Sequence, residues 1–295
     1  MNTTASKQNQ FSRNLIQLNI AMVLISTSGV LGKYIDLPVV LTIGFRALIA
    51  SVLLFAFCYF KKFNLKIEKE DRPKVILAGV LMGLHWVTYF NALRLSNVAI
   101  GMLSLFTFPA FTAILGPLIL KTKILKFHLL LCFLVLLGIY FLVPEFTVGS
   151  DTLTAVASGV FSAICYALRN ILMKDKVHRY NGSVMMSYQM LITSIILCPF
   201  MFVLDTSLVL DYFPYILTLA LLTTAFGHTL FLYSLKHFST VTVSIISCTQ
   251  PIYGIIIGMI FLAEFPEPST IIGGAVIVFT VIAESWRLQK VKKSV

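Results

Sequence analysis

Charged residues are scarce in this sequence, and acidic ones are the scarcest. Only 12% of the 295 residues are charged, with 12 Asp or Glu against 23 Lys or Arg, whereas soluble domains carry about 25% charged residues. Hydrophobic residues make up 58% of the chain, a composition that excludes an ordinary soluble globule. Ten membrane helices of about 20 residues each would use about 200 residues, which leaves no room for a soluble domain.

The motifs of metal binding and of catalysis are missing as well. The five cysteines lie in apolar stretches, without a CxxC pair and without a histidine at the spacing of a zinc site. The sequence has no HExxH, GxxxxGK[ST] or GxSxG motif. We therefore expect no metal and no cofactor. A membrane-embedded enzyme and a channel are alternatives for which the sequence offers no motif.

Apolar runs divide the chain into ten predicted helices, each long enough to cross the hydrocarbon core. They cover residues 15–33, 38–60, 73–93, 97–120, 125–143, 152–173, 183–204, 212–235, 241–263 and 268–285. The sequence thus predicts an all-α membrane protein.

Lysine and arginine are concentrated in alternate links between these helices. One side of the membrane receives 19 of them and the other side only Lys33 and Arg94, where seven acidic residues gather. Because positively charged links stay in the cytoplasm, both termini are expected there, with the protein in the inner (plasma) membrane. The net charge of +11 forms no continuous basic face, so it indicates contact with anionic lipids and not with nucleic acid.

The two halves of the chain are similar at a shift of about 143 residues, and the matches fall in corresponding predicted helices. The shift places residues 46–54 over 189–197, His85 over His228 and, with one residue of slip, Pro109 over Pro251.

Each half contains five predicted helices, in residues 1–145 and 146–295. An odd number means that the second half enters the membrane from the opposite face. The expected fold is therefore ten transmembrane helices arranged as two inverted five-helix repeats, the symmetry that alternating access uses. A duplicated structural bundle without a transport role is the other interpretation.

With these features the sequence resembles the drug/metabolite transporter superfamily, and within it the EamA branch of ten-helix proteins. The resemblance covers nearly the whole chain and rests on Phe45-Arg46-Ala47, the segment from His85 to Ala92, Phe108-Pro109, Gln250-Pro251 and Ala263-Glu264. The first half departs from the family pattern, because it has Lys121-Thr122 where an acidic residue is often seen. The resemblance implies membrane transport of small metabolites through a cavity lined by the first, third, fourth, sixth, eighth and ninth helices.

No acidic residue lies near the middle of a predicted helix, whereas Arg46, Arg169, His85 and His228 lie inside helices. A carrier of organic cations needs a buried anion, and buried arginine instead suits a carboxylate. We therefore expect a secondary transporter, in the direction of export, of neutral or carboxylate-bearing metabolites such as amino acids. Nucleotide-like and drug-like metabolites are alternatives, and for both arginines a purely structural role is the alternative.

The expected substrate site is a central cavity between the two halves. One helical face carries His85 and Tyr89, with Trp86 beside them, and each proline frees a backbone carbonyl near a polar residue. The predicted substrate-binding residues are His85, Trp86, Tyr89, Thr107, Tyr166, Arg169, Asn170 and Gln250. The predicted structural or gating residues are Arg46, Pro109, Pro251 and His228. We expect a monomer whose partners are a small-molecule substrate and membrane lipids.

Overall fold

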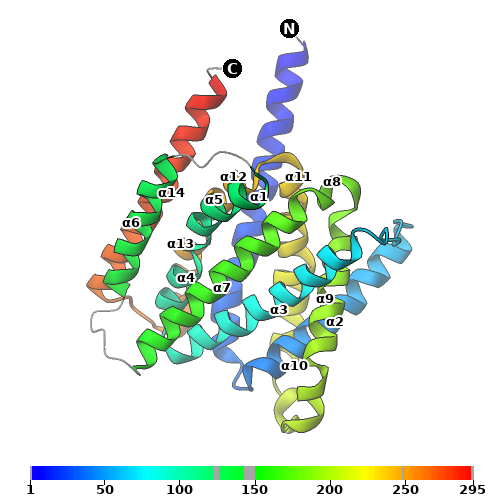
Figure 1. Ribbon diagram of the computed structural model, residues 1–295. Helices are drawn as coiled ribbons and strands as arrows, with labels where there is room; N and C mark the ends of the chain where they lie inside the picture. The colour runs from blue at the N-terminus through cyan, green and yellow to red at the C-terminus, as the bar shows by residue number, and fades with distance from the viewer. Residues whose placement is uncertain (1, 122–125, 143–149, 248, 294–295) are drawn as a thin grey trace.

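The computed structural model describes residues 2–121, 126–142, 150–247 and 249–293, and every regular element in these ranges is helical (Figure 1). In chain order the elements are α1 (Asn2–Tyr34), α2 (Val39–Phe60), α3 (Arg72–Leu95), α4 (Val98–Leu105), α5 (Phe108–Ile119), α6 (Lys126–Leu142), α7 (Asp151–Lys174), α8 (Lys176–Arg179), α9 (Gly182–Val203), η1 (Ser207–Val209), α10 (Phe213–Thr218), η2 (Leu219–His228), α11 (Thr229–His237), α12 (Thr240–Ser247), α13 (Gln250–Leu262) and α14 (Pro268–Lys293). The predicted all-α class is confirmed for this part of the chain.

Within the described residues, seven helical segments are long and apolar enough to cross a membrane. They are Ser12–Tyr34, Val39–Phe60, Arg72–Leu95, Val98–Ile119, Asp151–Lys174, Gly182–Val203 and Phe213–His237. Two further apolar helices, Gln250–Leu262 and Pro268–Thr280, are shorter, and α6 has 17 residues. The chain is therefore a multi-pass membrane protein, and the count of ten spans stays a prediction.

The helices pack in pairs that join the two halves of the chain. The most extensive contacts are those of α3 with α7, α2 with α9, α6 with α14, and α1 with η2 and α13. Figure 1 shows α3 and α7 crossing the bundle side by side, with α6 and α14 along one edge. Small residues allow membrane helices to approach one another closely. At Gly79 of α3, for example, an added Cβ would lie only 2.6 Å from Cβ of Ile192 of α9, so a larger residue would not fit without a shift.

Two of the apolar segments are interrupted directly before a proline. α4 ends at Leu105 and α5 begins at Phe108, with Pro109 in its first turn. α13 begins at Gln250, with Pro251 in its first turn. Proline lacks the N–H that continues a helix, and the interruptions lie beside the two prolines that were expected to free a backbone carbonyl. The role of these prolines as gates stays a prediction.

A third irregularity, which the sequence does not predict, is the π-helix η2, ten residues long. It continues directly into α11 and lies against α1 and α2. Stretches of π-helix are rare and occur mostly at functional sites, so η2 directs attention to the residues that surround it.

Candidate functional site

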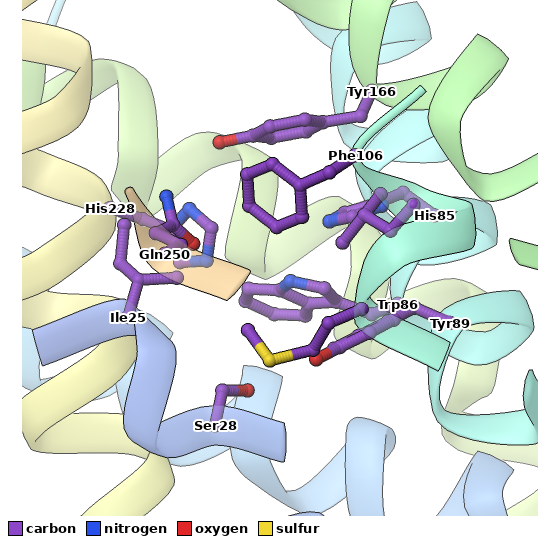
Figure 2. A pocket seen from close by; sticks show the side chains of 11 residues that line it. Ile25, Ser28, His85, Trp86, Tyr89, Phe106, Tyr166, His228 and Gln250 are labelled. Atoms are coloured by element: carbon purple, nitrogen blue, oxygen red, sulfur yellow. The ribbon is translucent and has the colours of Figure 1, made fainter. Parts of the chain in front are cut away.

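A small cavity lies at the centre of the bundle, surrounded by aromatic rings (Figure 2). Its lining residues come from α1, α3, α4, α7, η2 and α13, the six helices that the family resemblance implies: Ile25, Ser28, His85, Trp86, Tyr89, Met102, Leu105, Phe106, Tyr166, His228 and Gln250. The space open to the centre of a water molecule is about 20 Å³, which is room for about one water. The structure therefore shows a closed cavity.

The cavity wall is built by stacked rings from α3 and α7. The ring of His85 lies 4.4 Å from that of Tyr166, at an angle of 19°, and 6.3 Å from that of Tyr89. Trp86 meets His228 edge to face, with ring centroids 5.4 Å apart. Among the described residues, Nδ1 of His228 has no hydrogen-bond partner. The wall therefore combines apolar faces with a few polar edges.

Arg46 of α2 lies behind Trp86, outside the cavity lining. Its guanidinium carbon lies 3.7 Å from the centroid of the Trp86 ring, a cation–π geometry. Nε donates to Thr224 at 2.8 Å and Nη2 to Thr223 at 2.6 Å, so two hydroxyls of η2 hold the side chain. Nη1 lies 3.4 Å from the Ser28 hydroxyl. Arg46 is fully buried and has no acidic partner among the described residues.

Arg169 of α7 is the second fully buried arginine. Its Nε donates to Oε1 of Gln189 at 2.6 Å, and Nη1 donates to Oδ1 of Asn170 at 2.9 Å. Gln189 is the residue that the internal repeat places over Arg46. Each half thus contains one fully buried arginine whose hydrogen-bond partners among the described residues are all neutral.

Five of the eight predicted substrate-binding residues line the cavity, namely His85, Trp86, Tyr89, Tyr166 and Gln250, and so does His228. The other three, Thr107, Arg169 and Asn170, are buried outside the lining. The hydroxyl of Thr107 donates to the carbonyl of Ser104 at 2.8 Å, directly before the break in the helix. Asn170 has a buried Nδ2 without a partner among the described residues.

Sequence reasoning missed the lining residues of α1 and α4. Ile25 and Ser28 of α1 have no ionisable group or proline beside them, and Met102 and Leu105 of α4 are ordinary apolar residues of a membrane helix. Phe106 alone had a signal, because it lies three residues before Pro109.

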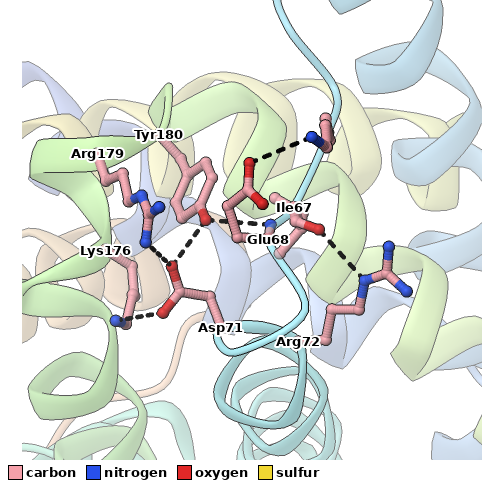
Figure 3. A network of polar contacts seen from close by, with 8 residues as sticks. Ile67, Glu68, Asp71, Arg72, Lys176, Arg179 and Tyr180 are labelled. Carbon is pink, nitrogen blue, oxygen red and sulfur yellow. Dashed lines mark hydrogen bonds and ion pairs between the residues drawn. The ribbon is translucent and has the colours of Figure 1, made fainter.

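One end of the bundle is held by the Asp71 cluster, which consists of Asp71, Lys176, Arg179 and Tyr180 (Figure 3). The carboxylate of Asp71 accepts from Lys176 at 2.6 Å, from Tyr180 at 2.7 Å and from Arg179 at 3.0 Å. The hydrogen bond from Lys176, followed by that from Tyr180, holds the pKa of Asp71 below its ordinary value. The cluster ties the link between α2 and α3 to α8 and the link after it.

The opposite end of the bundle is held by the Glu264 cluster, which consists of Glu264, Lys33, Ser96 and Val98. Oε2 of Glu264 accepts from the backbone N–H of Val98 at 2.7 Å, at the start of α4. Lys33, at the end of α1, lies 3.5 Å from Oε1 of Glu264 and donates to the carbonyl of Ser96 at 2.6 Å. The segment after α13 is thus tied to α1 and α4.

Comparison with known proteins gives the chain a family. The EamA-like transporter family matches residues 14–143 and 153–284. The pseudopaline exporter CntI of Pseudomonas aeruginosa is 24% identical over 249 residues, which are 84% of this chain and 87% of that protein. The threonine/homoserine exporter RhtA of Escherichia coli K12 is 25% identical over 286 residues, or 95% and 93% of the two chains.

The fold is also similar to that of a solved crystal structure. The TM-score is 0.73 at 15% sequence identity, with 95% of this chain and 99% of that chain covered. At this identity the likeness concerns the fold alone. Since the family match extends over most of the sequence, the chain belongs to the EamA-like transporter family.

Proposed function

We propose that this protein exports small carboxylate-bearing metabolites, amino acids in particular, by alternating access through the central cavity. The observation that carries the proposal is the pair of buried arginines, Arg46 and Arg169, which have no acidic partner among the described residues. The names of the relatives CntI and RhtA describe exporters of pseudopaline and of threonine and homoserine, which supports export of molecules of this kind.

The charge of Arg46 favours an anion in the cavity over a cation. Its guanidinium lies 3.7 Å behind the centroid of the Trp86 ring, so a ligand group stacked on the other face would lie about 7.5 Å from the charge. At an effective dielectric constant of about 20, the interaction amounts to about 2 kcal/mol. Reversing the sign of the ligand charge changes the energy by about 4 kcal/mol, or roughly a thousandfold in affinity.

Alternating access is supported by the closed state of the structure and by its packing. The cavity is too small for a metabolite, and the Asp71 and Glu264 clusters tie the helices together at opposite ends. When the two halves are exchanged, α1 takes the place of α7, α2 that of α9, and α3 that of η2 and α11. The contact of α3 with α7 then corresponds to the contact of η2 and α11 with α1, and the contact of α2 with α9 corresponds to itself. We infer two inverted five-helix repeats, which have similar-energy arrangements open to either side.

The end with the Asp71 cluster is proposed to face the cytoplasm, with the protein in the inner membrane. α1 begins and α14 ends at the same end of the bundle, and α8 lies toward that end (Figure 1). A cysteine placed at Lys66, in the link between α2 and α3, should react with a membrane-impermeant thiol reagent only from the cytoplasmic side. Strong labelling of this cysteine in intact cells would contradict the proposed orientation.

The proposed substrate class can be tested with purified protein in lipid vesicles. Radiolabelled amino acids, tetraethylammonium and a neutral sugar are offered in separate assays, and the amino acids are expected to move fastest. Arg46→Gln should reduce amino-acid transport relative to the sugar, because the buried positive charge is removed while hydrogen-bonding capacity is kept. Preferential transport of tetraethylammonium by the wild-type protein would contradict the proposal.

A further inference from the structure

The side chain of Ser162 makes two hydrogen bonds with the same histidine. Its hydroxyl donates to the carbonyl oxygen of His85 at 2.7 Å, and Nδ1 of His85 lies 2.7 Å from the hydroxyl oxygen. Ser162 lies on α7 and His85 on α3, the most extensively packed pair of helices, and both side chains are buried.

These two contacts decide which ring nitrogen carries the proton. A hydroxyl has one proton to donate, and a carbonyl oxygen can only accept. The Ser162 proton therefore goes to the carbonyl of His85, and the short contact at Nδ1 is a hydrogen bond only if Nδ1 carries its own proton. In a neutral imidazole this leaves Nε2 as an acceptor.

The ring cannot easily turn away from this arrangement. Tyr166, one helical turn after Ser162, stacks on the His85 ring at 4.4 Å, so α7 holds both an edge and a face of the ring. Figure 2 shows a ring nitrogen of His85 pointing into the cavity. No donor among the described residues occupies Nε2, which leaves it free for a ligand.

We propose that Ser162 is a positioning residue for substrate recognition. By fixing His85 with Nε2 as an acceptor, it selects substrates that present a hydrogen-bond donor, such as a primary ammonium group, to the α3 wall of the cavity. This inference rests on the proposed transport through the central cavity.

Among the described residues, the equivalent histidine of the second half, His228, lacks this arrangement. The repeat places His228 over His85. Nδ1 of His228 has no partner among the described residues. Of the two equivalent histidines, only His85 has a hydrogen bond at Nδ1 among the described residues, so we assign the ammonium group of an amino acid to its side of the cavity.

The protonation of His85 can be read directly, without any transport assay. The protein is labelled with ¹⁵N-histidine in lipid nanodiscs, and the ring signals of His85 are those that disappear in His85→Gln. We expect Nδ1 to be protonated and Nε2 unprotonated in the wild-type protein at neutral pH. Ser162→Thr should keep this pattern because it keeps a hydroxyl, whereas Ser162→Ala should lose it. A protonated Nε2 in the wild-type protein, or unchanged signals in Ser162→Ala, would overturn the proposal.

The effect on recognition is measured with two substrates of equal charge, L-alanine and its N,N,N-trimethyl derivative, which has no N–H donor. The wild-type protein should prefer L-alanine, and Ser162→Ala should reduce the ratio of the two kcat/KM values about tenfold, the effect of one hydrogen bond to a charged group. A residue that only stabilised the fold would lower both rates and leave the ratio unchanged, which counts against the proposal. If the wild-type protein transports neither compound, the proposed substrate class fails, and the ¹⁵N signals still decide the role of Ser162.

Discussion

Replacing Asp71 with asparagine should open the end of the bundle that its cluster holds. Asp71 is 4% exposed and accepts three hydrogen bonds from the segment that follows α7. The substitution keeps the size of the side chain but removes its charge and turns an N–H₂ group toward either Lys176 or the pair of Arg179 and Tyr180. The link between α2 and α3 should therefore separate from α8.

The size of the effect follows from the three bonds. The bond from Lys176, whose side chain is 14% exposed, is charge-assisted and contributes about 1.5–3 kcal/mol, and the bond from Tyr180 is of the same kind. The pair with Arg179 contributes about 0–1 kcal/mol, because that side chain is 55% exposed. Since asparagine still accepts one bond, we expect a loss of about 3 kcal/mol. The open state should then be populated about a hundredfold more than in the wild-type protein.

The assay is the reaction of a cysteine at Ile25, in the cavity lining, in a protein whose five native cysteines are replaced by alanine. A membrane-impermeant thiol reagent is added to vesicles of each orientation. Asp71→Asn should accelerate labelling up to about a hundredfold from one side only. Glu68→Gln is the matched control, because Glu68 lies in the same link and its only ion pair among the described residues is with the exposed Lys66, at 3.5 Å. Equal labelling rates in both variants would refute the role of the cluster.

Acidification should affect this closure only at very low pH. Because the pKa of Asp71 is lowered, chiefly by the hydrogen bond from Lys176, its carboxylate stabilises the closed end at every pH above the ordinary value of about 3.9. This contribution is lost as the pH falls through the lowered pKa. The labelling rate of wild-type protein, after correction for the reagent's own pH dependence, should therefore be constant from about pH 8 to about pH 5. A tenfold rise over that range would contradict this assignment.

Two further predictions concern the opposite end and the cavity. Glu264→Gln should accelerate labelling of the cavity cysteine from the side opposite to that affected at Asp71, whereas Glu267→Gln, three residues further on, should not; equal effects would exclude a specific role for Glu264. Tyr89→Ala and Gln250→Ala should each lower amino-acid transport at least tenfold at unchanged membrane content, measured in vesicles, whereas Phe133→Ala, whose side chain is 62% exposed on α6, should leave it nearly unchanged. Loss of transport in the control alone would place the site on the wrong helices.

Much of the architecture follows from local features of the sequence. Hydrophobic runs define membrane helices because water is absent from the hydrocarbon core, and the seven described segments that are long and apolar enough to cross a membrane coincide with predicted ones. The breaks before Pro109 and Pro251 lie where proline removes a backbone hydrogen bond from the helix, whereas Pro117 and Pro199 lie inside α5 and α9 without ending them. Spacing along one helix face also brought His85 and Tyr89 together, and both line the cavity.

The contacts that organise the site were not predictable, because they join residues far apart in the chain. Ser162 lies 77 positions from His85, and nothing in the sequence distinguishes it from other serines of membrane helices. Thr223 and Thr224, which bind Arg46, lie on the π-helix η2, a conformation that the sequence did not predict. Asp71 meets Lys176 across 105 positions, which no local rule anticipates.

The two halves of the chain have the same backbone conformation at one pair of equivalent positions, but different side chains follow it. Lys121 and Ala263 both have positive φ angles, 54° and 53°, at positions related by the shift of 142 residues that also relates the two prolines. The same shift places Thr122 over Glu264. The first half therefore has no acidic residue at the position that is equivalent to Glu264. At the other end of the bundle the acidic residue is Asp71, which accepts hydrogen bonds from three side chains. Glu264 has only Lys33 and one backbone N–H as partners among the described residues.

Two inverted repeats of identical chemistry would make the two open states equal in energy. Three donors hold Asp71 and two hold Glu264, so under the proposed alternating access we expect the empty carrier to open more easily at the end with the Glu264 cluster. If the Asp71 end faces the cytoplasm, opening to the cytoplasm must be driven by the binding energy of the substrate, because a ligand shifts a conformational equilibrium only by its differential affinity for the two states. A carboxylate that lies closer to Arg46 in the state open to the cytoplasm than in the other state would contribute to this shift, and the whole interaction of about 2 kcal/mol is the upper limit of that contribution. The empty carrier would then open to the cytoplasm less often than to the other side, and substrate binding would raise the population that is open to the cytoplasm.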